Sequence, residues 1–303
     1  MKKMIHCKKH TNSKKKKVLY NILFFIALIA FIISAYMLIK ILILDPNANK
    51  DLNKEIQDVH YSEPSPFEKL LTINSDIKGW IKIDNTPIDY PVLYSDYYLR
   101  RDYNKQYTKY GSIFIDNTCK LENNPQNILL HGHHMQDGSM FAKICDFTDL
   151  NFYKTTPVFT FDTIYESGIW KIISIYRTNT NSAQGEIFNY LQSEFESDHS
   201  DFLEYVYQVK IRSNIDTPVD IAKDDKLVTL STCSYELPDF RTVLVARKAR
   251  AGESQEVDTS RARYSDAPLM PDAYYQKYGG SKPNVTSFKD ALSKNKINWY
   301  KET

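Results

Sequence analysis

The sequence of 303 residues has little glycine, with nine residues, and only four cysteines. It contains no C-x-x-C pair and no Cys/His spacing typical of a zinc site, so we expect no metal and no cofactor. Hydrophobic residues make up 42% and charged residues 25%, which excludes a chain that is disordered, collagen-like or coiled-coil throughout. The 22 Tyr and 15 Phe favour β-strands.

The chain has net positive charge only in its first 17 residues. That segment holds eight lysines and no acidic residue, whereas the rest of the chain has 31 basic and 37 acidic residues, a formal charge of about −6. A domain that binds nucleic acid needs positive charge on its folded surface. The composition therefore argues against nucleic acid as a partner.

The sequence has one long hydrophobic run, from Val18 to Leu44, in which Lys40 is the only charged residue. It is long enough to cross a hydrocarbon core of roughly 30 Å as a helix. A buried core helix would be shorter and carry a polar stripe, and a cleaved signal peptide would end in a small-residue cleavage site. We therefore predict an uncleaved single-pass membrane anchor. The lysines of 1–17 would keep the N-terminus in the cytoplasm and place the rest of the chain outside the cell membrane.

Beyond this run the spacing of hydrophobic residues changes from a helical pattern to a strand pattern. Residues 45–63 are polar and predict a short helix or stalk, and Ser65 with Glu68 could cap a helix over 65–74. From residue 79 the pattern is of short strands bounded by Asn, Asp, Pro and Gly, which predicts a mainly β fold of barrel or sandwich type. The expected strands are 79–84, 88–94, 111–116, 127–133, 158–163, 168–178, 226–232 and 241–248. Helical spacing is expected at 139–156 and 186–209.

The segment after residue 249 is polar. Only 287–301 has a weak amphipathic pattern, so the composition is typical of a partly disordered tail with a terminal helix. The alternative is a docking element or a lid.

Cys233 lies at the end of an expected strand, in the segment LVTLSTCSYE. A side chain there is held rigidly and still reaches the open rim of the sheet. Many cysteines are simply small apolar core residues. Here, however, the neighbours Ser231, Thr232 and Ser234 are polar, so Cys233 is a candidate nucleophile.

A thiol nucleophile needs a partner that favours the thiolate, most often histidine. Three of the seven histidines cluster in NILLHGHHMQDGSMF. His131 and His133 share one face if the strand continues, and His134 then points the other way. The cluster could alternatively end a strand or bind a metal, although three histidines within four residues rarely reach one ion.

Arg241 begins the last expected strand, just after the turn that follows Cys233. If strands 226–232 and 241–248 pair, Arg241 returns to the level of the cysteine. A guanidinium there can stabilise a developing oxyanion. The alternative is a surface arginine paired with Asp239 or Glu236.

Taken together, these segments resemble the sortases. The resemblance is carried by TLSTC (229–233), HGHHM (131–135) and DFRTVLVARK (239–248), and GWIKID, IDYPVLYSDYYL, GSIFID and DGSMFAKI are similar to class B sortases in particular. It covers roughly residues 64–249. It implies an eight-stranded sortase-type β-barrel with N-terminal helices and an inserted helix, preceded by one transmembrane helix. The expected organisation is a cytoplasmic tail (1–17), an anchor (18–44), a linker (45–63), a catalytic domain (64–249) and an extension (250–303).

The resemblance also implies an activity, that of a membrane-anchored cysteine transpeptidase of Gram-positive bacteria. Cys233 would attack the carbonyl after a Thr in a C-terminal sorting motif of a surface protein. An amine of a peptidoglycan precursor would then resolve the thioacyl-enzyme. His133 would be the acid and base, Arg241 would hold the substrate and the oxyanion, and Leu99 and Ser231 would line the peptide groove.

Three other functions fit the same residues. A pilin-polymerising sortase would use a Lys side chain as the acceptor amine. A thiol peptidase would only hydrolyse its substrate. A surface-binding module with a barrel fold would have no catalytic activity.

Overall fold

The computed structural model describes residues 7–62, 66–196 and 198–302. The described chain divides into two compact units, one up to Glu55 and one from Ile56 onward. Ser65, expected to cap a helix, lies outside the described residues.

The described residues of the N-terminal unit form one continuous run of helix. Helix α1 (Cys7–Ile39) continues through a π-helical turn, η1 (Lys40–Leu44), into α2 (Asp45–Ser62). The side chains of the apolar run are exposed almost throughout, with no buried face. By length and composition, one helix in the described chain could cross a membrane, and it begins at Lys15.

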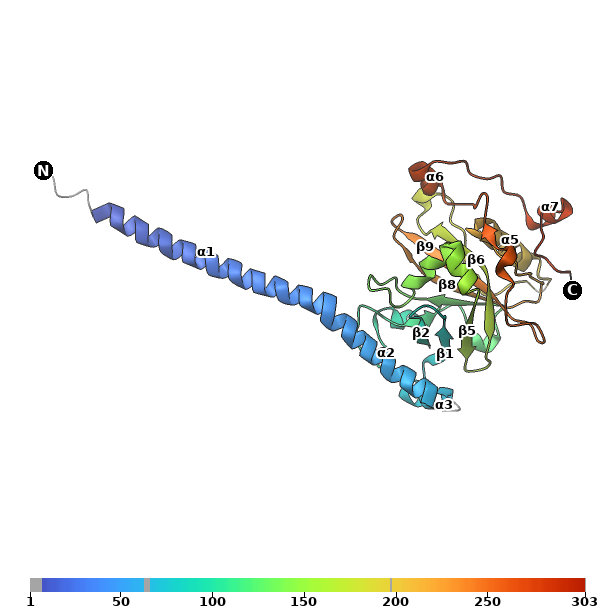
Figure 1. Ribbon diagram of the computed structural model, residues 1–303, viewed down its shortest axis with the longest axis horizontal. Helices are drawn as coiled ribbons and strands as arrows, with labels where there is room; N and C mark the ends of the chain where they lie inside the picture. The colour runs from blue at the N-terminus through green and yellow to red at the C-terminus, as the bar shows by residue number, and fades with distance from the viewer. Residues whose placement is uncertain (1–6, 63–65, 197, 303) are drawn as a thin grey trace. The chain divides into compact units, whose positions relative to one another are not determined.

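The second unit is built on a closed barrel of eight strands in the order β1-β2-β3-β4-β8-β9-β6-β5 (Figure 1). Its strands are β1 (Ile77–Lys82), β2 (Asp89–Tyr94), β3 (Ile113–Ile115), β4 (Asn127–His131), β5 (Val158–Thr163), β6 (Ile169–Asn179), β8 (Leu227–Ser234) and β9 (Phe240–Lys248). The pairs β2–β3 and β4–β8 are parallel, and the other pairs are antiparallel. Each expected strand is one of the eight barrel strands, so the predicted eight-stranded fold is confirmed.

Short helices and one small sheet surround the barrel. The helices are α3 (Pro66–Ile73), η2 (Asp96–Arg100), η3 (Leu121–Asn123), η4 (Ala142–Thr148), α4 (Leu150–Thr155), η5 (Ser182–Gln184), α5 (Ser200–Arg212), η6 (Thr259–Arg261), α6 (Asp272–Tyr278) and α7 (Phe288–Ser293). The small sheet pairs β7 (Ile215–Asp216) with β10 (Arg263–Tyr264). The end of α2 packs on β1, where the rings of His60 and Trp80 stack with 3.9 Å between their centroids.

Alternating side chains divide β8 and β9 between two apolar clusters. Leu230 and Leu244 point into the barrel and join the cluster that fills it. Val243 and Val245 point outward, into a second cluster that α5 covers. Cys233 is in phase with the outward set, because Ser231 is opposite Val243 in the β8–β9 register. The cysteine therefore belongs to the outer face of the sheet.

The helix expected over 186–209 is wrong in its first half. Residues 186–196 form no helix, and α5 begins only at Ser200. We call residues 180–196 the β6–α5 segment. It lies on the outer face, where the ring of Phe188 is 6.2 Å from that of Tyr176. Phe188, Tyr190 and Phe195 pack on this face, whereas Ile187 and Leu191 are exposed, so the apolar spacing resembles a helical period without forming a helix.

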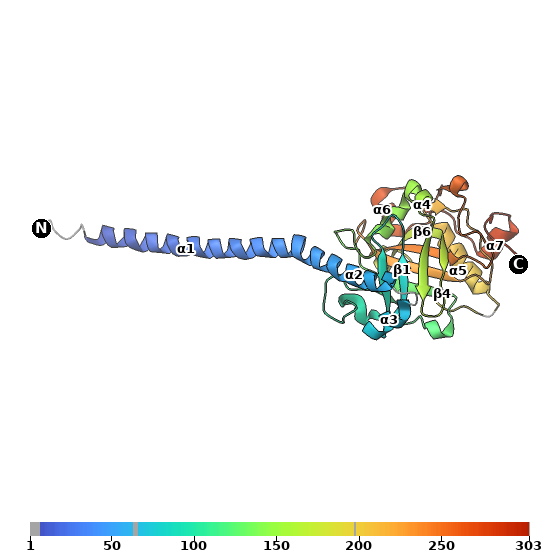
Figure 2. The ribbon, with the colours of Figure 1, turned by 60° about the horizontal axis from the view of Figure 1, so that its bottom comes forward.

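The polar C-terminal extension is part of the second unit. It contains β10, α6 and α7, where the sequence indicated one helix over 287–301. Trp299 and Tyr300 pack against the outer cluster. Helix α7 lies beside α5 in both views (Figure 1, Figure 2).

Candidate active site

Cys233 and Arg241 are directly opposite each other on neighbouring strands. Their Cα atoms are register partners in the antiparallel β8–β9 pair, so both side chains leave the same face of the sheet. Arg241 is also opposite Thr178 of β6. The expectation that Arg241 returns to the level of the cysteine is therefore met by strand pairing alone.

The acidic residues close to Arg241 in the sequence interact with other side chains. Glu236 pairs with Arg177, with 2.7 Å between Oε2 and Nε, and Asp239 accepts a hydrogen bond from Asn181. Within the described ranges, Arg241 has no carboxylate partner, and its Nη1 donates to the carbonyl of Phe240 at 3.2 Å. Most of its donors remain free for a substrate.

His133 lies two residues beyond β4, close to the strand that carries Cys233. The parallel β4–β8 register places His131 opposite Ser231, and the N–H of Gly132 then donates to the Ser231 carbonyl at 3.2 Å. Thr232 donates back to the Gly132 carbonyl at 2.9 Å. The two segments thus stay side by side as far as Gly132 and Thr232, one residue before His133 and Cys233.

The two nitrogens of His133 have different environments. Nε2 is 2.8 Å from the carbonyl oxygen of Leu99, which only accepts, so Nε2 carries the proton. Nδ1 has no hydrogen-bond partner among the residues described. It is therefore the atom able to exchange a proton with a substrate.

The other two histidines of the cluster are engaged. His131 lies 2.8 Å from Asp116, whose pKa the hydrogen bond from His131 holds well below its usual range. The strand expected to run to residue 133 ends at His131, so His134 does not simply point away. Instead its Nδ1 is 2.8 Å from the carbonyl oxygen of Cys233. Each of the three rings thus uses one nitrogen in the described hydrogen bonds, and His133 is the one whose partner is neither a carboxylate nor a group of the Cys233 strand.

Burial lowers the pKa of His133 below its ordinary value of 6.5, and the charge of Arg100 acts in the same direction. The hydrogen bond to Leu99 opposes them without reversing the shift. At neutral pH the ring is therefore mainly neutral and can accept a proton.

Leu99 and Ser231, the residues expected in the peptide groove, differ in exposure. The side chain of Leu99 is 44% exposed, and its carbonyl fixes His133. Ser231 is buried, and its hydroxyl lies 3.0 Å from the hydroxyl of Tyr190 in the β6–α5 segment. Burial raises the pKa of Tyr190, so the phenol stays neutral.

Three cysteines have described side chains and all are free thiols: Cys119, Cys145 and Cys233. Cys119 is buried in the barrel core, and Cys145 lies 3.2 Å from the hydroxyl of Thr242. Among the described residues, no group of three or more His, Cys, Asp or Glu side chains could hold a metal ion.

Comparison with known proteins decides the family. The family model for the sortase domain matches residues 81–249. The chain belongs to the sortase family. Sortase B of Staphylococcus aureus is 35% identical over 186 residues, which are 60% of this chain and 73% of that protein. Sortase B of Listeria monocytogenes is 35% identical over 196 residues, 62% of this chain and 72% of that one.

Solved structures agree with this assignment. A complex described as Staphylococcus aureus sortase B with substrate has a TM-score of 0.62 at 30% identity, covering 68% of this chain and 99% of that one. The protein is thus a sortase B-type enzyme, and sortases are cysteine transpeptidases of the cell wall.

Sequence reasoning missed two residues of this sortase's site. His134 was expected to point away, because the strand was extended too far. Tyr190 was concealed within the wrongly expected helix over 186–209. The two-residue spacing of Phe188 and Tyr190 was the signal that could have revealed Tyr190, because residues two apart share one face of an extended chain.

Proposed function

We propose that this sortase cleaves a sorting motif near the C-terminus of surface proteins after Thr. It then joins the new carboxyl end to an amine of a peptidoglycan precursor. The observation that carries the proposal is the pairing of Cys233 and Arg241 across β8 and β9 on one outer face. A sulfur nucleophile and a permanent cation at that spacing suit attack on a carbonyl whose oxygen becomes negative.

Each side chain has one role. As the Sγ of Cys233 bonds to the carbonyl carbon of Thr, Nδ1 of His133 takes the thiol proton, and Arg241 donates to the developing oxyanion. His133 then gives this proton from Nδ1 to the leaving amine, and the C–N bond breaks to leave a thioester. The acceptor amine attacks the thioester and loses a proton to Nδ1, which returns it to the departing sulfur as the C–S bond breaks.

The groove is proposed to run past Leu99 on one side and the β6–α5 segment on the other. Leu99 is exposed enough to contact a peptide. Ser231 contributes from beneath, since its hydroxyl fixes Tyr190.

We further infer that residues 18–44 anchor the enzyme in the cell membrane, with 1–17 in the cytoplasm and the catalytic domain outside. The length and apolar composition of the helix support a membrane span, and the lysine-rich flank supports this orientation. The boundaries 45–63, 64–249 and 250–303 remain the proposed linker, catalytic domain and extension.

The test is a library of Thr-containing peptides incubated with the full chain in detergent, with and without an added amine. We expect a thioacyl adduct on Cys233 by mass spectrometry and, when amine is present, a peptide–amine product. Cys233→Ala should form no adduct, whereas the control Cys145→Ser should still form one. Cleavage without amine product would favour the thiol peptidase, and no adduct on Cys233 would overturn the enzymatic proposal. A lysine-bearing acceptor that outcompetes a precursor amine would favour pilin polymerisation.

A further inference from the structure

Two loops border the nucleophile, and they are joined to each other. One is the β6–α5 segment (180–196), and the other is the turn between β8 and β9 (235–239), which directly follows the Cys233 strand. Gln184 donates to the carbonyl of Pro238 at 2.7 Å. We call the two loops together the groove wall.

The groove wall has further internal bonds at its base. The backbone N–H and the hydroxyl of Thr180 both donate to the carbonyl of Asp239, at 3.0 and 2.8 Å. Asn181 donates to the carboxylate of the same residue at 3.2 Å. A displacement of one loop is therefore transmitted to the other.

Helix α6 of the C-terminal extension contacts both loops. Lys277 donates from Nζ to the carbonyl of Glu236 at 2.8 Å. At the start of the helix, a Cβ added to Gly185 would lie 2.9 Å from the backbone nitrogen of Asp272. Only glycine allows the segment to approach the helix this closely, and its φ of +120° is also a glycine conformation.

Behind these contacts the groove wall is not solidly packed. A cavity of about 480 Å³ lies between the β6–α5 segment and the extension, with Phe188 on one side and Met270 and Pro283 on the other. Close packing resists displacement, and an open space of this size does not. The support that α6 gives to the wall is therefore concentrated in the contacts of Lys277 and Asp272.

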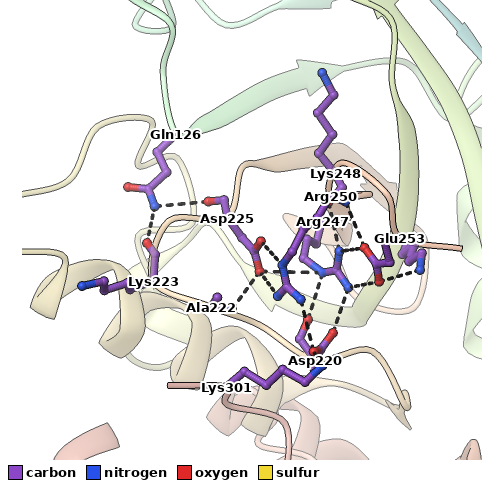
Figure 3. Close-up of polar contacts among 11 residues, drawn as sticks. Gln126, Asp220, Ala222, Lys223, Asp225, Arg247, Lys248, Arg250, Glu253 and Lys301 are labelled. Atoms are coloured by element: carbon purple, nitrogen blue, oxygen red, sulfur yellow. Dashed lines mark hydrogen bonds and ion pairs between the residues drawn. The ribbon is translucent and has the colours of Figure 1, made fainter. Parts of the chain in front are cut away.

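Both ends of the extension are fixed to one carboxylate. Asp220 pairs with Arg250 at 3.2 Å, near the start of the extension, and with Lys301 at 2.6 Å, near its end (Figure 3). Burial alone would raise the pKa of Asp220, but the hydrogen bonds from Lys301 and Arg250 outweigh it and lower the pKa. The extension thus leaves the barrel and returns to it at the same place.

A buried arginine secures this attachment. Arg247 of β9 is paired with Asp220 at 2.9 Å and with Glu253 at 2.6 Å, and its side chain is 1% exposed. Glu253 also pairs with Lys171 of β6 at 2.6 Å. Since a buried charge is costly without its partners, these pairs fix the geometry at the start of the extension. Helix α6 therefore lies in a segment that is attached to the rest of the domain at both of its ends, through Arg250 and Lys301.

We propose that the C-terminal extension is a positioning element for the peptide groove, in which α6 holds the groove wall beside Cys233 in the conformation that receives the substrate. This rests on the proposed function, because the substrate is the peptide that Cys233 attacks. Lys277 and Asp272 are positioning residues, since they touch the wall and not the reacting atoms.

The test compares Lys277→Met with Lys289→Met in the full chain. Both lysines are exposed in the extension, but no described contact of Lys289 reaches the groove wall. Lys277→Met should speed hydrogen–deuterium exchange in 180–196 and 235–239. It should raise the KM for a reporter peptide, chosen from the library with the unaltered enzyme, about threefold with little change in kcat. Lys289→Met should leave both measurements unchanged.

A stronger variant replaces residues 272–278 with a Gly-Ser chain of equal length. None of these seven residues is buried, so the core is kept. We expect faster exchange in the groove wall and a KM raised about tenfold. Unchanged exchange and KM in both variants would overturn this inference alone. If the unaltered enzyme forms no adduct with any library peptide, the proposed function fails, and the exchange measurement still decides whether α6 supports the wall.

Discussion

His134 donates a hydrogen bond from Nδ1 to the carbonyl oxygen of Cys233, with 2.8 Å between the two atoms. The hydroxyl of Tyr235 donates in return to the carbonyl of His134 at 2.8 Å. These bonds lie beyond the end of the β4–β8 pairing. They join the segment that carries His133 to the strand that carries Cys233.

Substitutions of His134 test the hydrogen bond to the Cys233 carbonyl without altering His133, the proposed acid and base. His134→Phe keeps a ring but loses the donor, and we expect kcat/KM to fall about tenfold, since a lost buried hydrogen bond costs about 1–2 kcal/mol. His134→Asn places an amide N–H near the position of Nδ1 and should recover most of the activity. His133→Asn should be inactive, because an amide cannot replace the proposed acid and base. Equal activity of the Phe and Asn variants of His134 would contradict the role given to this bond.

The charge of Arg100 should influence the pH profile of acylation. Burial lowers the pKa of His133, and Arg100 lowers it further. Arg100→Gln removes a positive charge and should raise the pKa, so the imidazolium persists to higher pH. Because the neutral ring is the form that accepts a proton, the acidic limb of kcat/KM should therefore move to higher pH, by about half a pH unit. The exposed Lys154→Gln is the control, and an acidic limb that moves to lower pH or stays fixed would show that Arg100 does not act on His133.

Gly132 should tolerate no side chain. A Cβ at this position would lie 2.5 Å from Ile113 and 2.6 Å from Phe141, both fully buried. Gly132→Ala should lower the free energy of unfolding by about 1–3 kcal/mol through overpacking and slow acylation by displacing His133.

Gly252→Ala is the comparison for this substitution. It is strained by a positive φ of 75° but meets no atom within 4 Å. It should lose about 1 kcal/mol of stability without slower acylation. Acylation that is unaffected by Gly132→Ala would contradict the steric argument.

Glu253 should contribute stability that disappears in acid. The hydrogen bond from Arg247 lowers the pKa of Glu253 far below its ordinary value of 4.5. A depressed folded-state pKa gives stability that is complete above the unfolded pKa and is lost as the pH falls below it. Glu253→Gln should therefore cost about 2 kcal/mol at pH 7 and progressively less between about pH 5 and pH 3.

Urea unfolding followed by tryptophan fluorescence, to which the buried Trp80 and Trp170 contribute, measures this difference. The control is Glu256→Gln, at an exposed residue of the same extension. A cost that is independent of pH would mean that the charge of Glu253 is not what stabilises the attachment.

The barrel was predictable because its signals are local. Each strand is a short run of β-branched and aromatic residues between turn residues, and these runs survive in the structure with small changes at their ends. The pairing of Cys233 with Arg241 was also within reach, because the intervening turn is short and a hairpin fixes its own register. The catalytic roles of Cys233, His133 and Arg241 remain predictions that the experiments above address.

Contacts between distant segments could not be predicted. The β6–α5 segment has helical spacing, yet Tyr190 is held by Ser231, 41 residues away. The extension is polar, yet its arginine and glutamate complete an ion-pair cluster with Asp220 and Arg247. Such partners become apparent only when the folded barrel brings the segments together. The polar composition of the extension, taken alone, indicates disorder.

The position of β9 between β8 and β6 has a consequence for the order of folding. This strand brings Arg241 opposite Cys233 and also closes the cylinder, so both events wait for residues 240–248. A chain folded only as far as β8 would display the thiol of Cys233 on an open sheet, without its guanidinium partner. Under the proposed mechanism, acylation of the cysteine therefore begins only when the last strand of the barrel is in place.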